Sequence, residues 1–260
     1  MITLPLRAFL NSSSFIGYSW AEAFFKLGNI HLMMDVEFVE ETPIKRGRYT
    51  VVTGFAGPGF IANTSVMYIV RRVGFSLKAY LRSPLLPPMM LIIDGKPVNS
   101  FRIYGGEGLL LIVSEVFPTS ENAWRIGEEL FKWLIEKGAS EFIAVEGSLR
   151  AVREVVGYST EGERLQMAGV KSTNEGAVTG INACLMERCL GKGIPWTSIF
   201  IPTTTVSTID YGGAAAAVEV LDRMFKLGVD ATPLRRMAEA VRKGAERGRG
   251  LRGLFRRGGA

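Results

Sequence analysis

The segment Tyr49-Thr-Val-Val-Thr-Gly-Phe-Ala-Gly-Pro-Gly-Phe-Ile-Ala-Asn63 carries the strongest fold signal in this chain. A β-rich beginning is followed by a loop and then by the apolar run Ile61 to Val73. A strand, a glycine loop and a helix in that order can place backbone amides and the positive end of a helix dipole beside a ligand. The loop has the spacing G-x-x-G-x-G, through Gly54, Gly57 and Gly59.

That spacing matches neither the dinucleotide fingerprint nor the lysine-bearing phosphate loop. No Lys, Ser or Thr directly follows Gly59, where the phosphates and magnesium of a nucleotide would need one. Two interpretations of the loop therefore remain open. It is either a ligand cradle or a tight strand-to-helix turn in which the glycines allow close packing.

Composition narrows the class of protein. With 260 residues and 47% hydrophobic content, the chain has enough apolar material for one medium-sized domain with a full core. No apolar run approaches the ~18–20 residues of a membrane span. Cys184 and Cys189 are predicted to be small buried apolar residues, without a disulfide or a zinc site, which fits a reducing cytoplasm.

The single histidine, His31, lies before the glycine loop. The body of the domain therefore lacks the histidine that a Ser-His-Asp triad, a Cys-His pair or a histidine-ligated zinc requires. We accordingly predict no catalytic residue, no metal ligand and no cofactor.

Apolar periodicity alternates between the patterns of helices and strands along the chain, which predicts an α/β fold with a mixed central sheet and flanking helices. The expected helices are Ile61 to Val73, Thr119 or Ser120 to Gly138, Gly176 to Leu190, Ala214 to Phe225 and Pro233 to Ala245. The expected strands are Phe75 to Leu81, Met89 to Ile93, Val98 to Tyr104, Leu109 to Ser114, Phe142 to Val145 and Trp196 to Ile201.

Two regions need further comment. The strands between Met89 and Ser114 are separated by Asp94-Gly95 and Gly105-Gly106, which predicts an antiparallel meander. The segment Val155 to Thr173 is ambiguous, and a strand at Leu165 to Val170 is one interpretation.

Three carboxylates follow expected strands: Glu115, Glu146 and Asp210. If the strands are parallel neighbours, these acids lie at one edge of the sheet, where α/β proteins bind ligands. Acids in surface loops or at helix caps are the alternative. The hypothetical ligand site comprises Gly54, Phe55, Gly57, Gly59, Asn63, Glu115, Glu146 and Asp210.

The positive charge is concentrated at the C-terminal end. The whole chain has a net charge of +6, whereas Arg235 to Ala260 alone has nine basic and two acidic residues. Several glycines in this segment predict that the helix ends near Arg247. The rest is interpreted either as a solvated tail or as a docking segment for an acidic partner, through Arg249, Arg252, Leu254, Phe255, Arg256 and Arg257.

Four segments together resemble the proteasome assembly chaperone 2 family: Val52 to Asn63, Tyr104 to Ser114, Glu175 to Asn182 and Asp210 to Ala217. The resemblance covers roughly Val36 to Val241. It implies a fold similar to that of purine nucleoside phosphorylases, and a homo-oligomer that binds the proteasome core particle or its subunits. Some family members carry an older label of ATP-grasp enzyme.

The chain departs from this family at both ends. Archaeal relatives that engage the proteasome end in a hydrophobic-Tyr-x motif, whereas this sequence ends Arg257-Gly-Gly-Ala260. We therefore do not expect insertion of the tail into the core particle. The expected organisation is an N-terminal extension at 1–34, with Met33 or Met34 as possible native starts, a domain at 35–245 and a basic flexible tail at 246–260.

Two function classes follow. In the first, the protein is a non-enzymatic, cytoplasmic, oligomeric chaperone or adaptor of archaeal type, acting without nucleic acid or a membrane. In the second, it is a small-molecule binder or enzyme that uses the loop Gly54 to Gly59.

Overall fold

In the computed structural model, residues 36–106, 108–149 and 154–257 can be described, with side chains up to residue 245. The unit Val36–Ala260 contains the fold. The expected N-terminal extension and His31 lie outside the described residues.

One nine-stranded sheet organises the domain, in the order β1-β3-β6-β7-β2-β8-β11-β9-β10. Its strands are β1 (Glu37–Glu40), β2 (Tyr49–Phe55), β3 (Ser76–Arg82), β6 (Phe101–Gly106), β7 (Leu109–Ser114), β8 (Ala139–Ser148), β9 (Val156–Ser159), β10 (Lys171–Ser172) and β11 (Trp196–Pro202). The strands β7, β2, β8 and β11 form a parallel centre. Antiparallel pairs extend it through β6, β3 and β1 on one side and through β9 on the other.

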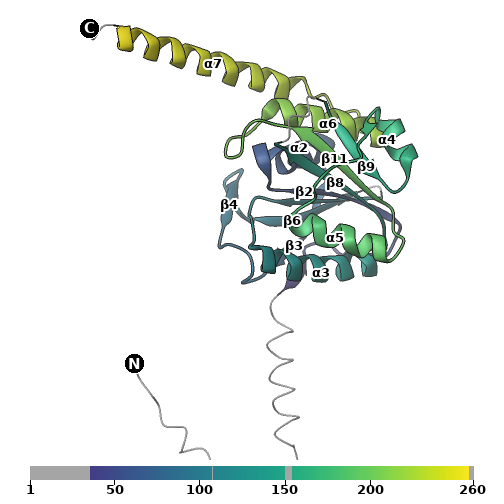
Figure 1. The fold of residues 1–260 in the computed structure, drawn as a ribbon. Helices are drawn as coiled ribbons and strands as arrows, with labels where there is room; N and C mark the ends of the chain where they lie inside the picture. Colours follow the sequence, from purple (N-terminus) through teal and green to yellow (C-terminus); the bar gives the residue numbers. More distant parts are fainter. Residues whose placement is uncertain (1–35, 107, 150–153, 258–260) are drawn as a thin grey trace, which may run out of the picture. The chain divides into compact units, whose positions relative to one another are not determined.

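Helices cover both faces of this sheet (Figure 1). One face is covered by α2 (Ile61–Val73), α4 (Gly162–Ala168), α6 (Tyr211–Phe225) and the start of α7 (Thr232–Arg257). The other is covered by α3 (Ser120–Lys137) and α5 (Gly180–Gly191). The predicted mixed α/β architecture with flanking helices is confirmed.

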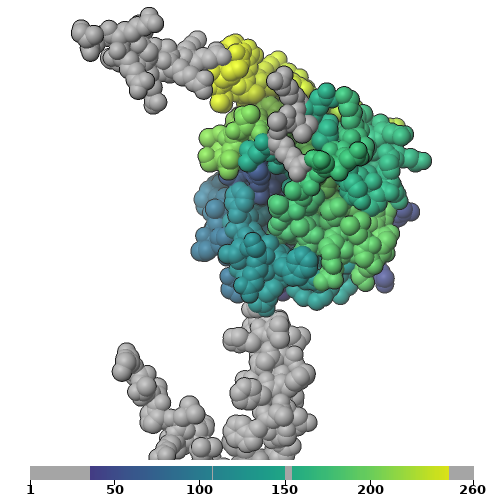
Figure 2. Space-filling model, viewed as in Figure 1, coloured from purple at the N-terminus to yellow at the C-terminus, as the bar shows by residue number. Residues whose placement is uncertain are grey.

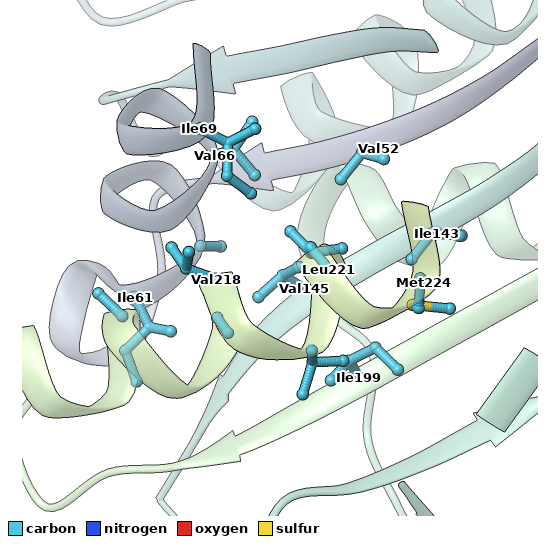
Figure 3. Close-up of a cluster of buried hydrophobic side chains, with 14 of the residues drawn as sticks. Val52, Ile61, Val66, Ile69, Ile143, Val145, Ile199, Val218, Leu221 and Met224 are labelled. Carbon is cyan, nitrogen blue, oxygen red and sulfur yellow. The ribbon is translucent and has the colours of Figure 1, made fainter. Parts of the chain in front are cut away.

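The core between the sheet, α2 and α6 consists of aliphatic side chains. Figure 3 shows Val66 and Ile69 of α2 and Val218 and Leu221 of α6 above the central strands. The four are at most 1% exposed. Each such side chain contributes about 1.5–3 kcal/mol through removal from water, so this layer fixes the position of the helix that follows the glycine loop.

Several helix boundaries agree with the sequence signals. The Thr119 hydroxyl accepts a hydrogen bond from the Asn122 amide at the start of α3, and Gly138 ends the helix with a φ of 97°. The helix α2 has the predicted bounds and ends at Gly74, with a φ of 80°. Left-handed backbone at a helix end favours glycine because glycine has no Cβ.

The predicted meander is wrong. The hairpin formed by β4 (Met90–Ile93) and β5 (Lys96–Asn99) is a separate two-stranded sheet. The expected strand Val98 to Tyr104 is interrupted at Ser100, after which β6 joins the main sheet. The expected turn at Gly105-Gly106 instead forms the end of β6, paired with β7. Local turn signals identified hairpins but not which sheet each strand joins.

Three further boundaries differ from the expected ones. The segment around Leu165 is the helix α4, and not a strand, because Leu165 and Ala168 lie one turn apart and are both buried. The helix α5 begins at Gly180 and not at Gly176, after an irregular segment. The helix α7 continues to Arg257 rather than ending near Arg247, so its glycines lower helix propensity without ending the helix.

Close packing between β2 and α2 requires glycine at position 54. A Cβ added there would lie 2.7 Å from Val66 Cβ and 2.9 Å from the carbonyl oxygen of Ala62. We expect Gly54→Ala to lower the free energy of unfolding by about 1–3 kcal/mol, because the helix must move away from the sheet. Chemical denaturation measures this change.

Gly191→Ala is the control, because a Cβ at Gly191 would meet nothing within 4 Å. Equal stability of the two variants would contradict the packing role of Gly54.

Candidate functional site

A cavity of about 530 Å³ lies where the parallel strands β7, β2 and β8 end. Because parallel strands share their direction, the segments that follow them meet at one edge of the sheet. The first turn of α5 completes the wall. Its lining residues are Phe55, Ala56, Gly57, Pro58, Val116, Phe117, Pro118, Glu146, Gly147, Ser148, Leu149, Ala177, Thr179, Gly180, Ile181 and Asn182.

A chain of hydrogen bonds connects the interior of the sheet to this cavity. The Thr53 hydroxyl donates to Asn182 Oδ1 at 2.8 Å, and Asn182 Nδ2 donates to Glu146 Oε1 at 2.7 Å. Thr53 and Asn182 are buried, and Glu146 is half-buried. The chain therefore fixes the orientation of a carboxyl group whose Oε1 is already hydrogen-bonded.

Burial raises the pKa of Glu146 from 4.5 to about 7, against the opposing effect of the Asn182 hydrogen bond. The charged form is unfavourable because the side chain loses hydration without a cation among the described lining residues. Glu146 can therefore exchange a proton near neutral pH, which is a property of groups in binding and catalytic sites.

The glycine loop lies against β8 and α6. A Cβ at Gly147 would lie 2.1 Å from the Pro58 carbonyl oxygen, so β8 can approach the loop only at a glycine. The Gly59 carbonyl accepts a hydrogen bond from the Asp210 amide at 2.9 Å. These contacts fix Gly57 and Pro58 at the wall of the cavity.

Phe60 has a left-handed backbone, with a φ of 46°, at the junction between this loop and α2. Such a conformation costs a non-glycine residue of the order of 1 kcal/mol and is found mainly where surrounding contacts enforce it. The Phe60 ring packs edge-on against Phe117 of the cavity wall, with 5.9 Å between centroids.

The structure brings only part of the hypothetical ligand site together. Phe55, Gly57 and Glu146 line the cavity, whereas Gly54 and Gly59 do not line it and are instead closely packed. Asn63 is buried in the first turn of α2 and does not line the cavity. Among the described residues its Oδ1 atom has no hydrogen-bond partner.

The other two carboxylates have structural partners. Glu115 forms an ion pair with the buried Arg102, whose Nη1 lies 3.0 Å from Glu115 Oε2. Asp210 caps α6, because its Oδ1 accepts a hydrogen bond from the Gly213 amide at 2.8 Å. The helix-cap alternative is therefore the better description of Asp210, and Glu115 stabilises the junction between β6 and β7.

The residues that sequence reasoning missed come from α5. Gly180, Ile181 and Asn182, in the first turn of α5, line the cavity, whereas the sequence suggested the start of α2. Asn182 belongs to one of the four segments that carry the family resemblance, which was the available signal. Its pairing with Glu146 depends on helix placement, which no local pattern shows.

The two cysteines of the chain are poor nucleophiles. Burial raises the pKa of Cys184 to about 11 and that of Cys189 to about 12, so both thiols remain protonated at neutral pH. Both cysteines are buried, as predicted. In the described part of the chain, no group of three or more His, Cys, Asp or Glu side chains could hold a metal ion. Within the same residues, no helix is long and apolar enough to cross a membrane.

A mixed sheet with helices on both faces, and a glycine loop at the ends of its parallel strands, defines the class of α/β proteins to which this chain belongs. Residues 51–247 match the model of the PAC2 family. The match covers more than half of the chain, so the protein belongs to the PAC2 family.

Solved structures agree with this assignment. The chain is similar to Pyrococcus furiosus PbaA, described as an archaeal homolog of proteasome-assembly chaperone, with 25% identity and a TM-score of 0.73. The similarity covers 86% of this chain and 95% of PbaA. Pyrococcus furiosus PbaB, described as an archaeal proteasome activator, shares the fold at 17% identity, with a TM-score of 0.68 over 83% of this chain and 99% of PbaB.

A protein of Methanocaldococcus jannaschii is also similar in sequence. It is 23% identical over 209 residues, which cover 79% of this chain and 87% of that uncharacterized protein. The predicted family is confirmed. The comparison with purine nucleoside phosphorylases stays a prediction.

The raised pKa of Glu146 predicts a pH-dependent stability. Between about pH 4.5 and 7 the folded state holds a proton that the unfolded state has released. The free energy of unfolding should therefore fall as the pH rises through this window, by at most about 1.4 kcal/mol per pH unit. Glu146→Gln should remove this contribution, so its stability relative to the unmodified protein should increase from pH 5 to pH 8.

Denaturation at several pH values measures the difference. The exposed Glu163→Gln is the control and should follow the unmodified protein. A difference for Glu146→Gln that is independent of pH would show that the carboxyl titrates normally.

Proposed function

We propose that this protein is a non-enzymatic, oligomeric chaperone or adaptor that binds the proteasome core particle or its subunits. The observation that carries the proposal is the similarity to PbaA over 86% of the chain, together with membership of the PAC2 family. The relatives from Pyrococcus and Methanocaldococcus support an archaeal type of member. The buried, protonated thiols fit a role in binding rather than in nucleophilic catalysis.

The basic end of α7 is the proposed contact with the partner. The segment 235–260 contains nine basic and two acidic residues and therefore has a net charge of +7. Positive charge aligned along a helix complements an acidic protein surface. The proposed partner contacts are Arg249, Arg252, Leu254, Phe255, Arg256 and Arg257.

This contact predicts a salt-dependent association with archaeal 20S core particles. Arg249→Gln/Arg256→Gln/Arg257→Gln should weaken binding at least ten-fold at low salt. The difference should shrink at higher salt, because the Debye length falls to ~8 Å at physiological ionic strength. Biolayer interferometry with immobilised core particles across a salt series measures the effect.

Arg46→Gln/Arg71→Gln/Lys192→Gln is a matched control, because it removes the same charge from exposed positions elsewhere. Equal losses in the two triple variants would indicate only a general charge effect. Undetectable binding of the unmodified protein at any salt concentration would refute the proposed partner.

Binding of a small molecule is the second candidate function, and the cavity with Glu146 favours it. A carboxyl with a pKa of about 7 beside aromatic side chains could hydrogen-bond a ligand that enters from the edge of the sheet. The older ATP-grasp label has no support in the fold. The main sheet of the described residues forms a single body rather than two subdomains that grip ATP.

Nucleotide titration tests this alternative. If the cavity binds adenosine or ATP, isothermal titration should give a heat signal that Glu146→Gln reduces and Glu163→Gln does not. No heat, or the same heat for both variants, would remove the cavity from consideration as a nucleotide site.

A further inference from the structure

The cavity beside Glu146 has a largely apolar wall. Neighbouring purple, teal and green atoms in Figure 2 show segments far apart in the sequence meeting at the surface of the body. The apolar side chains of the wall come from the segments after β2, β7 and β8 and from the start of α5: Phe55, Ala56, Pro58, Val116, Phe117, Pro118, Leu149, Ala177 and Ile181. A volume of about 530 Å³ is large enough for a small molecule. The body of such a molecule would be apolar.

The polar side chains of the cavity are oxygen acceptors rather than bases. Among the described lining residues, Glu146 is the single titratable side chain, whereas Ser148, Thr179 and Asn182 are uncharged. Asn182 Nδ2 donates to Glu146 Oε1, and Oε2 makes no hydrogen bond within the described part of the chain. Thr179 lies at the start of α5, and its side chain makes no cap hydrogen bond to the helix. Glu146 Oε2 and the Thr179 hydroxyl are therefore available to a ligand.

An ionised Glu146 lacks an opposite charge in the described wall. Of the acids at this edge of the sheet, Glu115 after β7 is paired with Arg102, and Asp210 accepts from the Gly213 amide at the start of α6. The described parts of α5 and of the glycine loop that line the cavity contribute no charged side chain. Burial therefore raises the pKa of Glu146 to about 7, and a proton neutralises the carboxylate below that pH. Above it, a cationic ligand would supply the missing charge.

The start of α5 does not reverse this preference. Backbone amides and the helix dipole favour an anion at the first turn of a helix. Asn182 is the third residue of α5 and donates to Glu146, so the carboxylate of Glu146 is itself the anion beside this turn. A second anion in the cavity would be repelled by that carboxylate, whereas a cation would be attracted to it.

We propose that this cavity binds a small molecule that has an ammonium group on an apolar body. An ammonium group has three N–H donors and no acceptor, so it needs oxygen atoms such as Glu146 Oε2 and the Thr179 hydroxyl. The apolar body would pack against the side chains of Phe55 and Phe117, and aromatic rings also attract cations. This ligand class rests on the second candidate function, the binding of a small molecule in the same cavity.

Three probes that share one ring test the proposal: 2-phenylethylamine, 2-phenylethanol and phenylacetate. Calorimetric titration of the full chain at pH 6, 7 and 8 measures their affinities. The amine should bind at least ten-fold more tightly than the other two at pH 8. Its affinity should rise about ten-fold from pH 6 to pH 8, because the ionised fraction of a carboxyl with a pKa of about 7 rises by about that factor. The affinity of the alcohol should stay constant.

Glu146→Gln tests the residue that carries the charge. The variant keeps an oxygen that can accept from Asn182 but has no negative charge. Its affinity for the amine at pH 8 should fall at least ten-fold and should no longer depend on pH, while its affinity for the alcohol stays the same. Glu163→Gln removes the same charge from an exposed position on α4 and should bind all three probes as the unmodified protein does.

Gly57→Leu tests the location without a change of charge. Gly57 lines the cavity and has an extended backbone, with a φ of −162°, that any residue can adopt. Apart from its chain neighbours, a Cβ there would approach no atom closer than the Phe55 carbonyl oxygen, at 3.9 Å. The added side chain should fill part of the cavity, so the amine and the alcohol should both bind at least ten-fold more weakly. Circular dichroism checks that the fold is retained.

Each failure points to a different conclusion. An amine that does not bind, that binds no more tightly than the alcohol, or whose affinity is independent of pH would overturn the proposed ligand class. Phenylacetate that binds more tightly, and most tightly at pH 6, would also overturn it and leave the cavity as a carboxylate site, so the second candidate function would survive. Core-particle binding is measured separately with the same proteins, and its absence would refute the chaperone function alone.

Discussion

The parallel pairing of β2 with β7 on one side and β8 on the other is the constraint on which the rest of the structure depends. It brings the three following segments to the same edge of the sheet, and it requires α2 to turn back over β2 at Gly54. Because the aliphatic layer of α2 and α6 then covers this face, the glycine loop is held between β8 and α6 rather than moving freely. The cavity beside Glu146 is a direct consequence of this arrangement.

The glycines around this edge have different physical reasons. Gly54 and Gly147 allow close approach of neighbouring backbone or side chains, and Gly59 combines close approach with a positive φ of 67°. A Cβ at Gly57 would have more room than at these positions, and Gly57 borders the cavity. The G-x-x-G-x-G spacing therefore reflects packing at two of its three positions, which explains why it matches no phosphate-binding pattern. The close packing supports the interpretation of the loop as a tight turn, and its role as a ligand cradle stays a prediction.

Charge is distributed unevenly between the body of the domain and α7. The body of the domain keeps its buried charges paired, as in Arg102 with Glu115, and leaves Glu146 as a half-buried carboxyl with a pKa near neutrality. The excess positive charge is carried by the segment that contains α7. A neutral folded body with one basic helix can attract an acidic surface over distance.

The sequence by itself determined the elements whose signals are local. The run Ile61–Val73, the cap Thr119 and the stop at Gly138 follow from periodicity and backbone preference, and α2 and α3 were predicted at their observed positions. Tertiary structure alone decided which strands share a sheet, and so separated β4 and β5 from the meander that their turns suggested. It also decided that Asn182, far along the chain, meets Glu146, whereas Glu115 meets Arg102 and Asp210 caps a helix. The physical reason is that pairing and burial depend on contacts between distant segments, which local patterns do not specify.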